Sequence, residues 1–241
     1  MLQQTQPTGI KVIFVDWHGV LSRDPFWISI LRNAWHPLHQ QLSEATENLF
    51  DRQIDRVHLW MRGELTANQI IESFQMTPGP EFPLDYLNRK VIEDCQLMRI
   101  NAPLVRALKD AKTTGTKIVL ATDNMDCFFE AIQQANQQRK CFEEETISFA
   151  STVQLFDDIL CSSEQRILKR EDPLRFYESW LKRQSFTFSN ALLLDDLEVN
   201  CIAFRTAGGQ ALRITHESLE YDQEVLFSEV ENWWRTENEP V

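Results

Sequence analysis

Short apolar runs alternate with stretches of helical periodicity along most of the chain. The runs are bounded by polar or glycine-containing turns, as buried parallel strands are, and they cover residues 11–16, 117–121, 158–161, 191–194 and 211–214. Helical periodicity covers about 103–113, 125–137, 172–182 and 197–204, with Pro103 and Pro173 at first-turn positions. This alternation predicts an α/β fold with a parallel sheet covered on both faces by helices.

Residues 25–99 depart from this alternation. They contain no strand-like run, they are rich in Trp, Leu, Gln and Glu, and Thr66 is suited to cap a new helix within them. We therefore expect a helical module inserted after the first strand and before the second.

The charge balance excludes some classes of partner. With 24 Lys and Arg against 36 Asp and Glu, the chain carries a formal charge of −12 and has no bulk attraction to nucleic acid or anionic lipid. No apolar run approaches the roughly 18 to 20 residues that span a bilayer, and the five cysteines are scattered singly. We expect a cytoplasmic protein, monomeric or homodimeric, without nucleic-acid or membrane partners.

Polar side chains follow four of the predicted strands. In an open parallel sheet, ligands bind beyond the carboxyl ends of the strands, where residues distant in sequence converge. The groups expected to meet there are Asp16; Thr122, Asp123 and Asn124; the turn at 162–163 that leads to Lys169; and Asp195 with Asp196.

These groups suit phosphoryl transfer. A carboxylate can act as the nucleophile, a hydroxyl and a lysine can hold phosphate oxygens, and further carboxylates can bind a hard divalent cation. Such a cation would also relieve the repulsion between three carboxylates and a phosphate dianion. The sequence therefore predicts Mg²⁺ as the cofactor and a small phosphorylated metabolite as the substrate.

Four segments, in order, resemble the motifs of the haloacid dehalogenase-like superfamily. VIFVDWHGVL is similar to the first motif, IVLATDN to the second, FDDILCSSEQRILKREDP to the stretch with the third-motif lysine, and LLLDDLEVNCIAF to the fourth. RGELTANQIIESF, within the helical module, resembles a segment of the family's helical caps. The resemblance covers about residues 11–214 and is to the subgroup that contains phosphoglycolate phosphatase and β-phosphoglucomutase.

The resemblance implies a Rossmann-like catalytic core, residues 1–24 and 100–241, and a helical cap, residues 25–99. It implies that Asp16 is the nucleophile, that Thr122 and Lys169 bind phosphate with Asp123 and Asn124 beside them, and that Mg²⁺ is held by Asp16, Asp195, Asp196 and the backbone carbonyl of His18. KREDP has one residue more than the family's KPDP, so that Lys169 is the best candidate for the third-motif lysine and Arg170 a weaker one.

His18 stands where phosphatases of this family usually have a second aspartate. An imidazole, with an ordinary pKa of ~6.5, can replace that acid/base group, and the protein is then a phosphate monoester hydrolase. Alternatively, the leaving group needs no acid, as in dehalogenases or in phosphonoacetaldehyde hydrolases, which use a cap lysine. Lys90 is the only lysine in 25–99. In a third interpretation, catalysis is lost and the protein binds a phosphate ligand or a partner.

Overall fold

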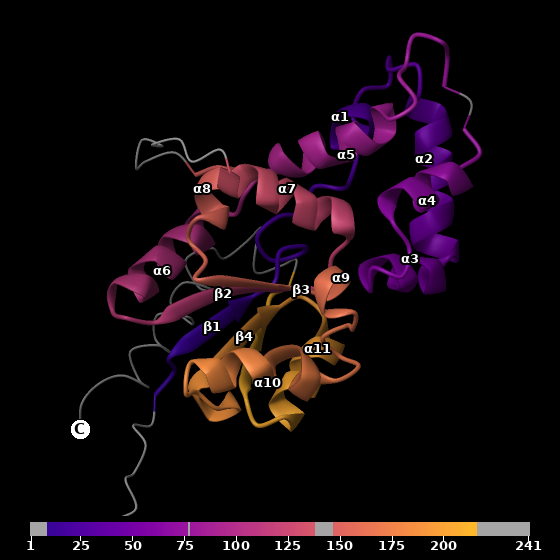
Figure 1. Cartoon of the computed structure of the whole chain (residues 1–241). Coiled ribbons are helices and arrows are strands. Elements are labelled where there is room, and N and C mark those ends of the chain that lie inside the picture. The colour runs from indigo at the N-terminus through magenta and orange to yellow at the C-terminus, as the bar shows by residue number, and fades with distance from the viewer. Residues whose placement is uncertain (1–8, 77, 138–146, 216–241) are drawn as a thin grey trace, which may run out of the picture.

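A five-stranded, fully parallel sheet forms the centre of the molecule (Figure 1). The computed structural model describes residues 9–76, 78–137 and 147–215. The strand order is β3-β2-β1-β4-β5, and the strands are β1 (Val12–Val15), β2 (Lys117–Thr122), β3 (Asp158–Cys161), β4 (Ala191–Asp195) and β5 (Gln210–Arg213). The predicted α/β fold with a parallel sheet is confirmed, and each strand lies within two residues of its predicted range.

Helices cover both faces of the sheet because successive residues of each strand point to opposite sides. On one face lie α6 (Ala102–Thr113), α7 (Asp126–Gln137) and α8 (Phe149–Val153), and on the other α10 (Pro173–Arg183) and α11 (Glu198–Thr206) (Figure 1). Asn101 and Asp172 cap α6 and α10 with their side chains, and a proline occupies the first turn of each, as predicted. The short helix α9 (Ser162–Gln165) follows β3 directly.

The segment of residues 25–99, between β1 and α6, consists of helices joined by loops, and no strand lies in its described part. It comprises α1 (Ile28–Leu31), α2 (His39–Glu47), the π-helical segment η1 (Asn48–Arg52), α3 (Ile54–Met61), α4 (Ala67–Ser73) and α5 (Tyr86–Gln96). Thr66 caps α4 in a reciprocal capping box with Gln69. In Figure 1 these helices lie together beyond one end of the sheet, and α5 packs along α7.

The apolar interior is continuous from the sheet into these helices. One cluster joins residues of β1 and β2 to α5, α7 and the aromatic side chains Trp27 and Trp60, both fully buried. The helical segment therefore shares a core with one face of the sheet. The second cluster, on the opposite face, holds Phe14, Tyr177 and Trp180.

Within the described residues, no helix is long and apolar enough to cross a membrane. The four cysteines in this part of the chain are buried and free, and Cys141 lies outside it. Residues 1–8 and 216–241 of the predicted core also lie outside the described ranges. A cytoplasmic location and the oligomeric state stay predictions.

Candidate active site

The carboxyl ends of β1, β2 and β4 place the predicted polar groups at one edge of the sheet. Asp16 follows β1 directly, Thr122 is the last residue of β2, and Asp195 is the last residue of β4. Asp16 and Asp195 lie side by side because β1 pairs with β4, and the Asp16 amide extends this pairing by donating to the carbonyl of Leu194 at 2.9 Å. Parallel pairing in register thus brings together residues almost 180 positions apart.

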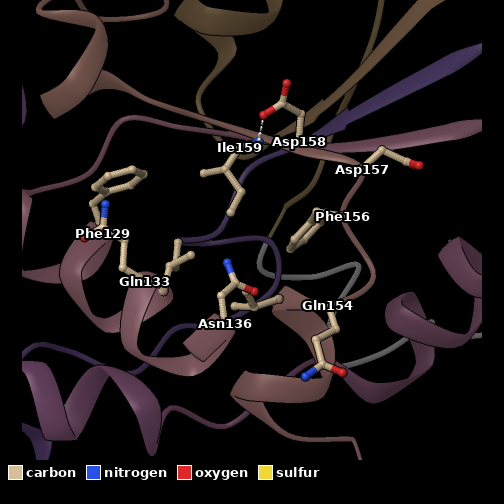
Figure 2. Close-up of a pocket in the computed structure, with 10 residues that line it drawn as sticks. Phe129, Gln133, Asn136, Gln154, Phe156, Asp157, Asp158 and Ile159 are labelled. Atoms are coloured by element: carbon tan, nitrogen blue, oxygen red, sulfur yellow. Dashed lines mark hydrogen bonds between the residues drawn. The ribbon is translucent and has the colours of Figure 1, made fainter. Parts of the chain in front are cut away.

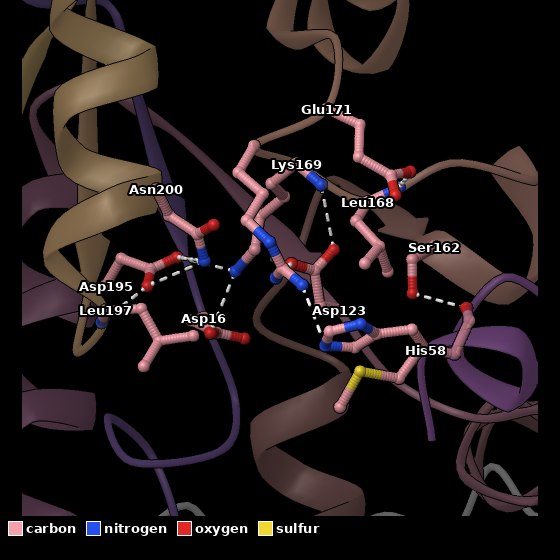
Figure 3. A network of polar contacts seen from close by, with 12 residues as sticks. Asp16, His58, Asp123, Ser162, Leu168, Lys169, Glu171, Asp195, Leu197 and Asn200 are labelled. Carbon is pink, nitrogen blue, oxygen red and sulfur yellow. Dashed lines mark hydrogen bonds and ion pairs between the residues drawn. The ribbon is translucent and has the colours of Figure 1, made fainter. Parts of the chain in front are cut away.

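Lys169 is the centre of the site (Figure 3). Its ammonium Nζ lies 2.8 Å from Oδ2 of Asp16 and 2.6 Å from Oδ2 of Asp195, and it donates to the carbonyl of Ala121 at 3.1 Å. The side chain is 1% exposed. Burial by itself would lower the pKa of Lys169, but the charges of Asp16 and Asp195 raise it well above its ordinary value. Lys169 is therefore a permanent buried cation between two carboxylates.

Asp195 is held by more than this ion pair. Asn200 donates from Nδ2 to both carboxylate oxygens of Asp195, at 3.1 and 3.2 Å, and the amide of Leu197 donates to Oδ1 at 2.9 Å (Figure 3). Asp195 has no exposed surface. These contacts fix its position and, through it, the position of the Lys169 ammonium.

Three carboxylates at this edge are close enough to hold one metal ion. Oxygen atoms of Asp16, Asp195 and Asp196 all lie within 4.8 Å of one another. Burial and the charges of Asp195 and Asp196 raise the pKa of Asp16 to about 8, although Lys169 opposes this shift. Burial and Asp195 also raise the pKa of Asp196. An all-oxygen set with excess negative charge fits a hard divalent cation such as Mg²⁺.

Gly19 lets the loop after β1 pass close to Asp196. Its φ is +81°, a conformation that side-chain-bearing residues rarely adopt, and a Cβ at this position would lie 2.3 Å from Oδ2 of Asp196. The glycine therefore permits both the turn after β1 and the close approach of the Asp196 carboxylate to that turn.

The loop after β2 presents buried polar atoms that have no hydrogen-bond partner among the described residues. These atoms are the donors Oγ1 of Thr122 and Nδ2 of Asn124 and the acceptor Oδ2 of Asp123, and all three residues are at most 9% exposed. Oδ1 of Asp123 accepts from the amide of Lys169 at 2.9 Å. This bond joins the loop after β2 to the lysine loop, the segment between α9 and α10 that carries Lys169. Buried donors without partners are costly unless a ligand satisfies them, so that this loop is suited to bind an anion.

His18 is half-buried in the loop after β1, two residues beyond Asp16. Burial lowers its pKa, against an opposing effect of the charge of Asp24. The imidazole stacks on Phe26, with ring centroids 6.0 Å apart and an interplanar angle of 22°. Among the described residues, none forms a hydrogen bond with the His18 side chain.

The helical segment contacts the loops that carry the site, partly through His58 and Met61, which the sequence did not single out. Ser162 donates from Oγ to the carbonyl of Met61 at 2.7 Å, and Arg170 donates to Nε2 of His58 at 2.8 Å (Figure 3). The indole of Trp60 donates to Oδ1 of Asp126 at 2.7 Å.

A second group of contacts joins the two linkers between the helical segment and the sheet. Asp24 accepts hydrogen bonds from the backbone amide of Arg99 at 2.7 Å and from its guanidinium at 2.8 Å, and it also pairs with Arg32. Its carboxylate is 2% exposed. The sequence indicated only that Asp24 and Arg99 lie at the two ends of the predicted helical module, and it did not indicate that they pair.

A hollow in the described part of the molecule lies away from these residues. It measures about 730 Å³ and is lined by α7, α8 and the start of β3, including Phe129, Phe156 and Ile159 (Figure 2). All strands of the sheet run in the same direction, so the start of β3 lies at the edge of the sheet opposite to the one that carries Asp16 and Asp195. None of the predicted site residues lines this hollow.

No protein-family model and no curated protein sequence matches the chain. Solved structures do match. A haloacid dehalogenase-family enzyme of Bacteroides thetaiotaomicron, bt-2542, has a TM-score of 0.61 at 16% identity over 91% of this chain and 98% of its own. A structure of the same enzyme with magnesium and inorganic phosphate has a TM-score of 0.60 at 16% identity, over 91% and 100% of the two chains.

The L-2-haloacid dehalogenase of Xanthobacter autotrophicus is also similar, with a TM-score of 0.58 at 13% identity over 92% of this chain and 83% of its own. Identities this low show the fold alone. The fold expected from the four motifs is thereby confirmed.

Proposed function

Because the chain has the haloacid dehalogenase-like fold, we propose that it is a Mg²⁺-dependent hydrolase of a small phosphate monoester, with Asp16 as the nucleophile. The observation that carries the proposal is the contact of Lys169 with both Asp16 and Asp195 at the carboxylate cluster. A buried lysine beside the nucleophile and a cation site beside both provide for the charge of a phosphate dianion. The similar enzyme with magnesium and phosphate bound supports the same chemistry.

The reaction proceeds in two displacements at phosphorus. A carboxylate oxygen of Asp16 attacks phosphorus while the bond to the ester oxygen breaks, and protonated His18 gives its proton to that leaving oxygen. His18, now neutral, then takes a proton from water as the water oxygen attacks phosphorus. The bond between Asp16 and phosphorus breaks, inorganic phosphate leaves, and both residues return to their starting forms.

The residues around Asp16 hold the phosphate and the cation. The hydroxyl of Thr122 and the amide of Asn124, unpartnered in the described chain, are offered to phosphate oxygens together with Lys169, and Asp123 orients the lysine loop. Asp16, Asp195, Asp196 and the carbonyl of His18 would hold Mg²⁺. Bound there, Mg²⁺ supplies charge neutralisation for phosphate oxygens and lowers the pKa of Asp16.

We further propose that residues 25–99 form a cap over the site, with residues 1–24 and 100–241 as the catalytic core. The contacts of His58 with Arg170 and of Met61 with Ser162 support this division, because they join the end of α3 to the segment that carries Lys169, a proposed phosphate-binding residue. A cap in this position excludes water from the reacting atoms.

The phosphonoacetaldehyde hydrolase alternative receives no support from the cap lysine. Lys90 pairs with Glu93 and with the buried Asp94, each at 3.3 Å, on its own helix. Burial alone would lower the pKa of Lys90, but Asp94 and Glu93 raise it. An amine that forms a Schiff base needs a lowered pKa, so that Lys90 is poorly suited to that role. A dehalogenase-type hydrolase, whose leaving group needs no acid, and a phosphate-binding or interaction protein without catalysis are the remaining alternatives.

The test is hydrolysis of p-nitrophenyl phosphate with and without Mg²⁺. We expect Mg²⁺-dependent turnover by the wild type and a loss of several orders of magnitude in Asp16→Asn, because the nucleophile is removed. Asp110→Asn, at an exposed carboxylate on α6, is the matched control and should keep full activity. No turnover by the wild type but a gain in His18→Asp would favour the binding-protein alternative. Turnover that persists in Asp16→Asn would contradict the mechanism.

A further inference from the structure

An acid/base imidazole works only when its ring is aimed at the reacting atom. Hydrolases usually fix the ring through a hydrogen bond from a third group to one of its nitrogens. His18 has no such bond to any described residue. Another contact has to set the orientation of this ring.

We propose that Phe26 is the positioning residue for His18. Its ring lies nearly parallel to the imidazole, at 22° and a centroid distance of 6.0 Å, within the range of favourable aromatic pairs. A flat neighbour of this kind restricts rotation of the imidazole about its side-chain bonds while both nitrogens stay accessible. The inference deepens the proposed function and rests on it, since it concerns how the acid/base group is aimed.

The backbone between the two residues brings Phe26 back over His18. Gly19 donates its amide to the carbonyl of Ser22 at 2.8 Å, and His18 and Ser22 form an isolated bridge. The loop therefore turns back directly after the acid/base position. Pro25 then precedes Phe26 and limits the backbone before it.

Phe26 is itself fixed by aromatic side chains of the helical segment. It is 6% exposed, and its ring centroid lies 5.9 Å from that of Trp60 and 6.4 Å from that of Phe50. Trp60 is anchored to the core through its hydrogen bond with Asp126. The orientation of His18 therefore depends on packing of the helical segment, which would couple the docked position of that segment to proton transfer.

The proposal separates two kinds of substrate. An alkyl phosphate expels a strongly basic alkoxide and needs the proton from His18, whereas p-nitrophenyl phosphate expels a weakly basic phenolate and hardly needs it. Loss of the Phe26 ring should therefore slow the first displacement with the alkyl ester only, whereas the water step, in which His18 acts as base, is common to both esters.

The experiment compares Phe26→Leu with wild type on ethyl phosphate and on p-nitrophenyl phosphate. We expect kcat for ethyl phosphate to fall at least about tenfold, towards the ~10² to 10⁴-fold that a general acid supplies, with KM unchanged. The burst rate of p-nitrophenolate release, which reports the first displacement alone, should be unchanged. Phe74→Leu is the matched control. Phe74 contacts Trp27 in the same aromatic group at 5.7 Å and should leave both substrates unaffected.

A double-mutant cycle distinguishes positioning from general damage. In a His18→Asn background, Phe26→Leu should cause no further loss on ethyl phosphate, because the group that it positions is gone. A fall in the p-nitrophenolate burst rate as large as the loss on ethyl phosphate, or a further loss in the His18→Asn background, would overturn the proposal.

A second measurement does not depend on turnover. A nuclear Overhauser effect between the ring protons of His18 and Phe26, assigned with the His18→Asn variant, should be observed in the wild type. Its absence would overturn the positioning contact. If the contact is present but neither ester is hydrolysed, the proposed function fails while the placement of His18 by Phe26 stands.

Discussion

At the scale of single residues, Asp16 is subject to opposing charges. One buried ammonium lies 2.8 Å from it, and two further carboxylates belong to the same cluster. Burial and those carboxylates outweigh the ammonium, and its pKa rises to about 8. A nucleophile must be ionised, so that a divalent cation is needed to restore the charged form near neutral pH.

Mg²⁺ affinity should therefore depend on pH. Below about pH 8 the cation must displace a proton from Asp16, and its apparent affinity should rise by up to about tenfold per pH unit and level off above that value. Isothermal titration calorimetry between pH 5.5 and 8.5 measures this slope. Asp16→Asn, which binds no such proton, should bind more weakly without this pH dependence. A constant affinity across the range in the wild type would contradict the raised pKa.

Gly19 should be indispensable for metal binding. Replacement by alanine would put a Cβ within 2.3 Å of Oδ2 of Asp196 and would force a positive φ, so that the carboxylate must move. We expect Gly19→Ala to lose at least about tenfold in Mg²⁺ affinity, besides ~1–2 kcal/mol of unfolding free energy from backbone strain.

Gly115→Ala is the matched control for this prediction. Gly115 also has a positive φ, +93°, but a Cβ there would meet nothing within 4 Å. It should show the same loss of stability in urea unfolding with Mg²⁺ affinity unchanged. Equal Mg²⁺ affinities in the two variants would show that the Gly19–Asp196 approach does not matter for the metal.

At the scale of elements, α3 is attached to α7 through one hydrogen bond. Trp60→Phe keeps an aromatic ring but removes the indole donor to Asp126, and a hydrogen bond to a charged partner contributes about 1.5–3 kcal/mol. We expect a loss of this size in unfolding free energy and faster hydrogen exchange in residues 58–67.

Trp180→Phe provides the comparison. Trp180 is as buried as Trp60, but its indole nitrogen has no hydrogen-bond partner among the described residues. The same loss of side-chain area should therefore cost less there and leave exchange in residues 58–67 unchanged. Equal losses in the two variants would show that area, and not the hydrogen bond, holds α3 in place.

The two linkers are joined by Asp24, and this pair should stabilise the protein in a defined pH range. Burial would raise the pKa of Asp24, but the hydrogen bonds and charges of Arg99 and Arg32 lower it overall. A carboxylate with a lowered native pKa stabilises the fold above its unfolded pKa, and this contribution is lost as pH falls through the native value.

Asp24→Asn should cost about 1.5–3 kcal/mol at pH 7, because the carboxylate loses charge-assisted hydrogen bonds while the exposed Arg99 and Arg32 are not left as buried charges. The difference from wild type should shrink below about pH 4, where the unfolded carboxyl group protonates. Urea unfolding at both pH values measures this. Asp85→Asn, at an exposed pair with Arg89, should cost less than about 1 kcal/mol at either pH. An undiminished difference at pH 3 would contradict an electrostatic origin.

At the scale of the whole molecule, the sheet and the helical segment share one apolar core next to the site. The sheet supplies the carboxylates at its carboxyl edge, and the helical segment supplies the aromatic group around Phe26 and Trp60. Because both regions belong to one buried cluster, a change in the packing of the helical segment reaches the site without touching the nucleophile.

The sequence by itself determined the elements and the residues that bear the chemistry. Strand periodicity located five strands to within two residues, and parallel strands must converge at their carboxyl ends, so that Asp16, Thr122 and Asp195 could be assigned to one edge from the sequence. The structure also joins the predicted Lys169 to Asp16 and Asp195. The catalytic and metal-binding roles of these residues stay predictions.

Only the tertiary structure decided which side chains meet across elements. Trp60 and Asp126 are 66 positions apart, and Asp24 and Arg99 are 75 apart, and no local pattern specifies either pair. The stacking of Phe26 on His18 likewise depends on a turn and on rings from two other helical segments. Periodicity reports which face of an element is buried, whereas the partner on that face is set by how the elements pack together.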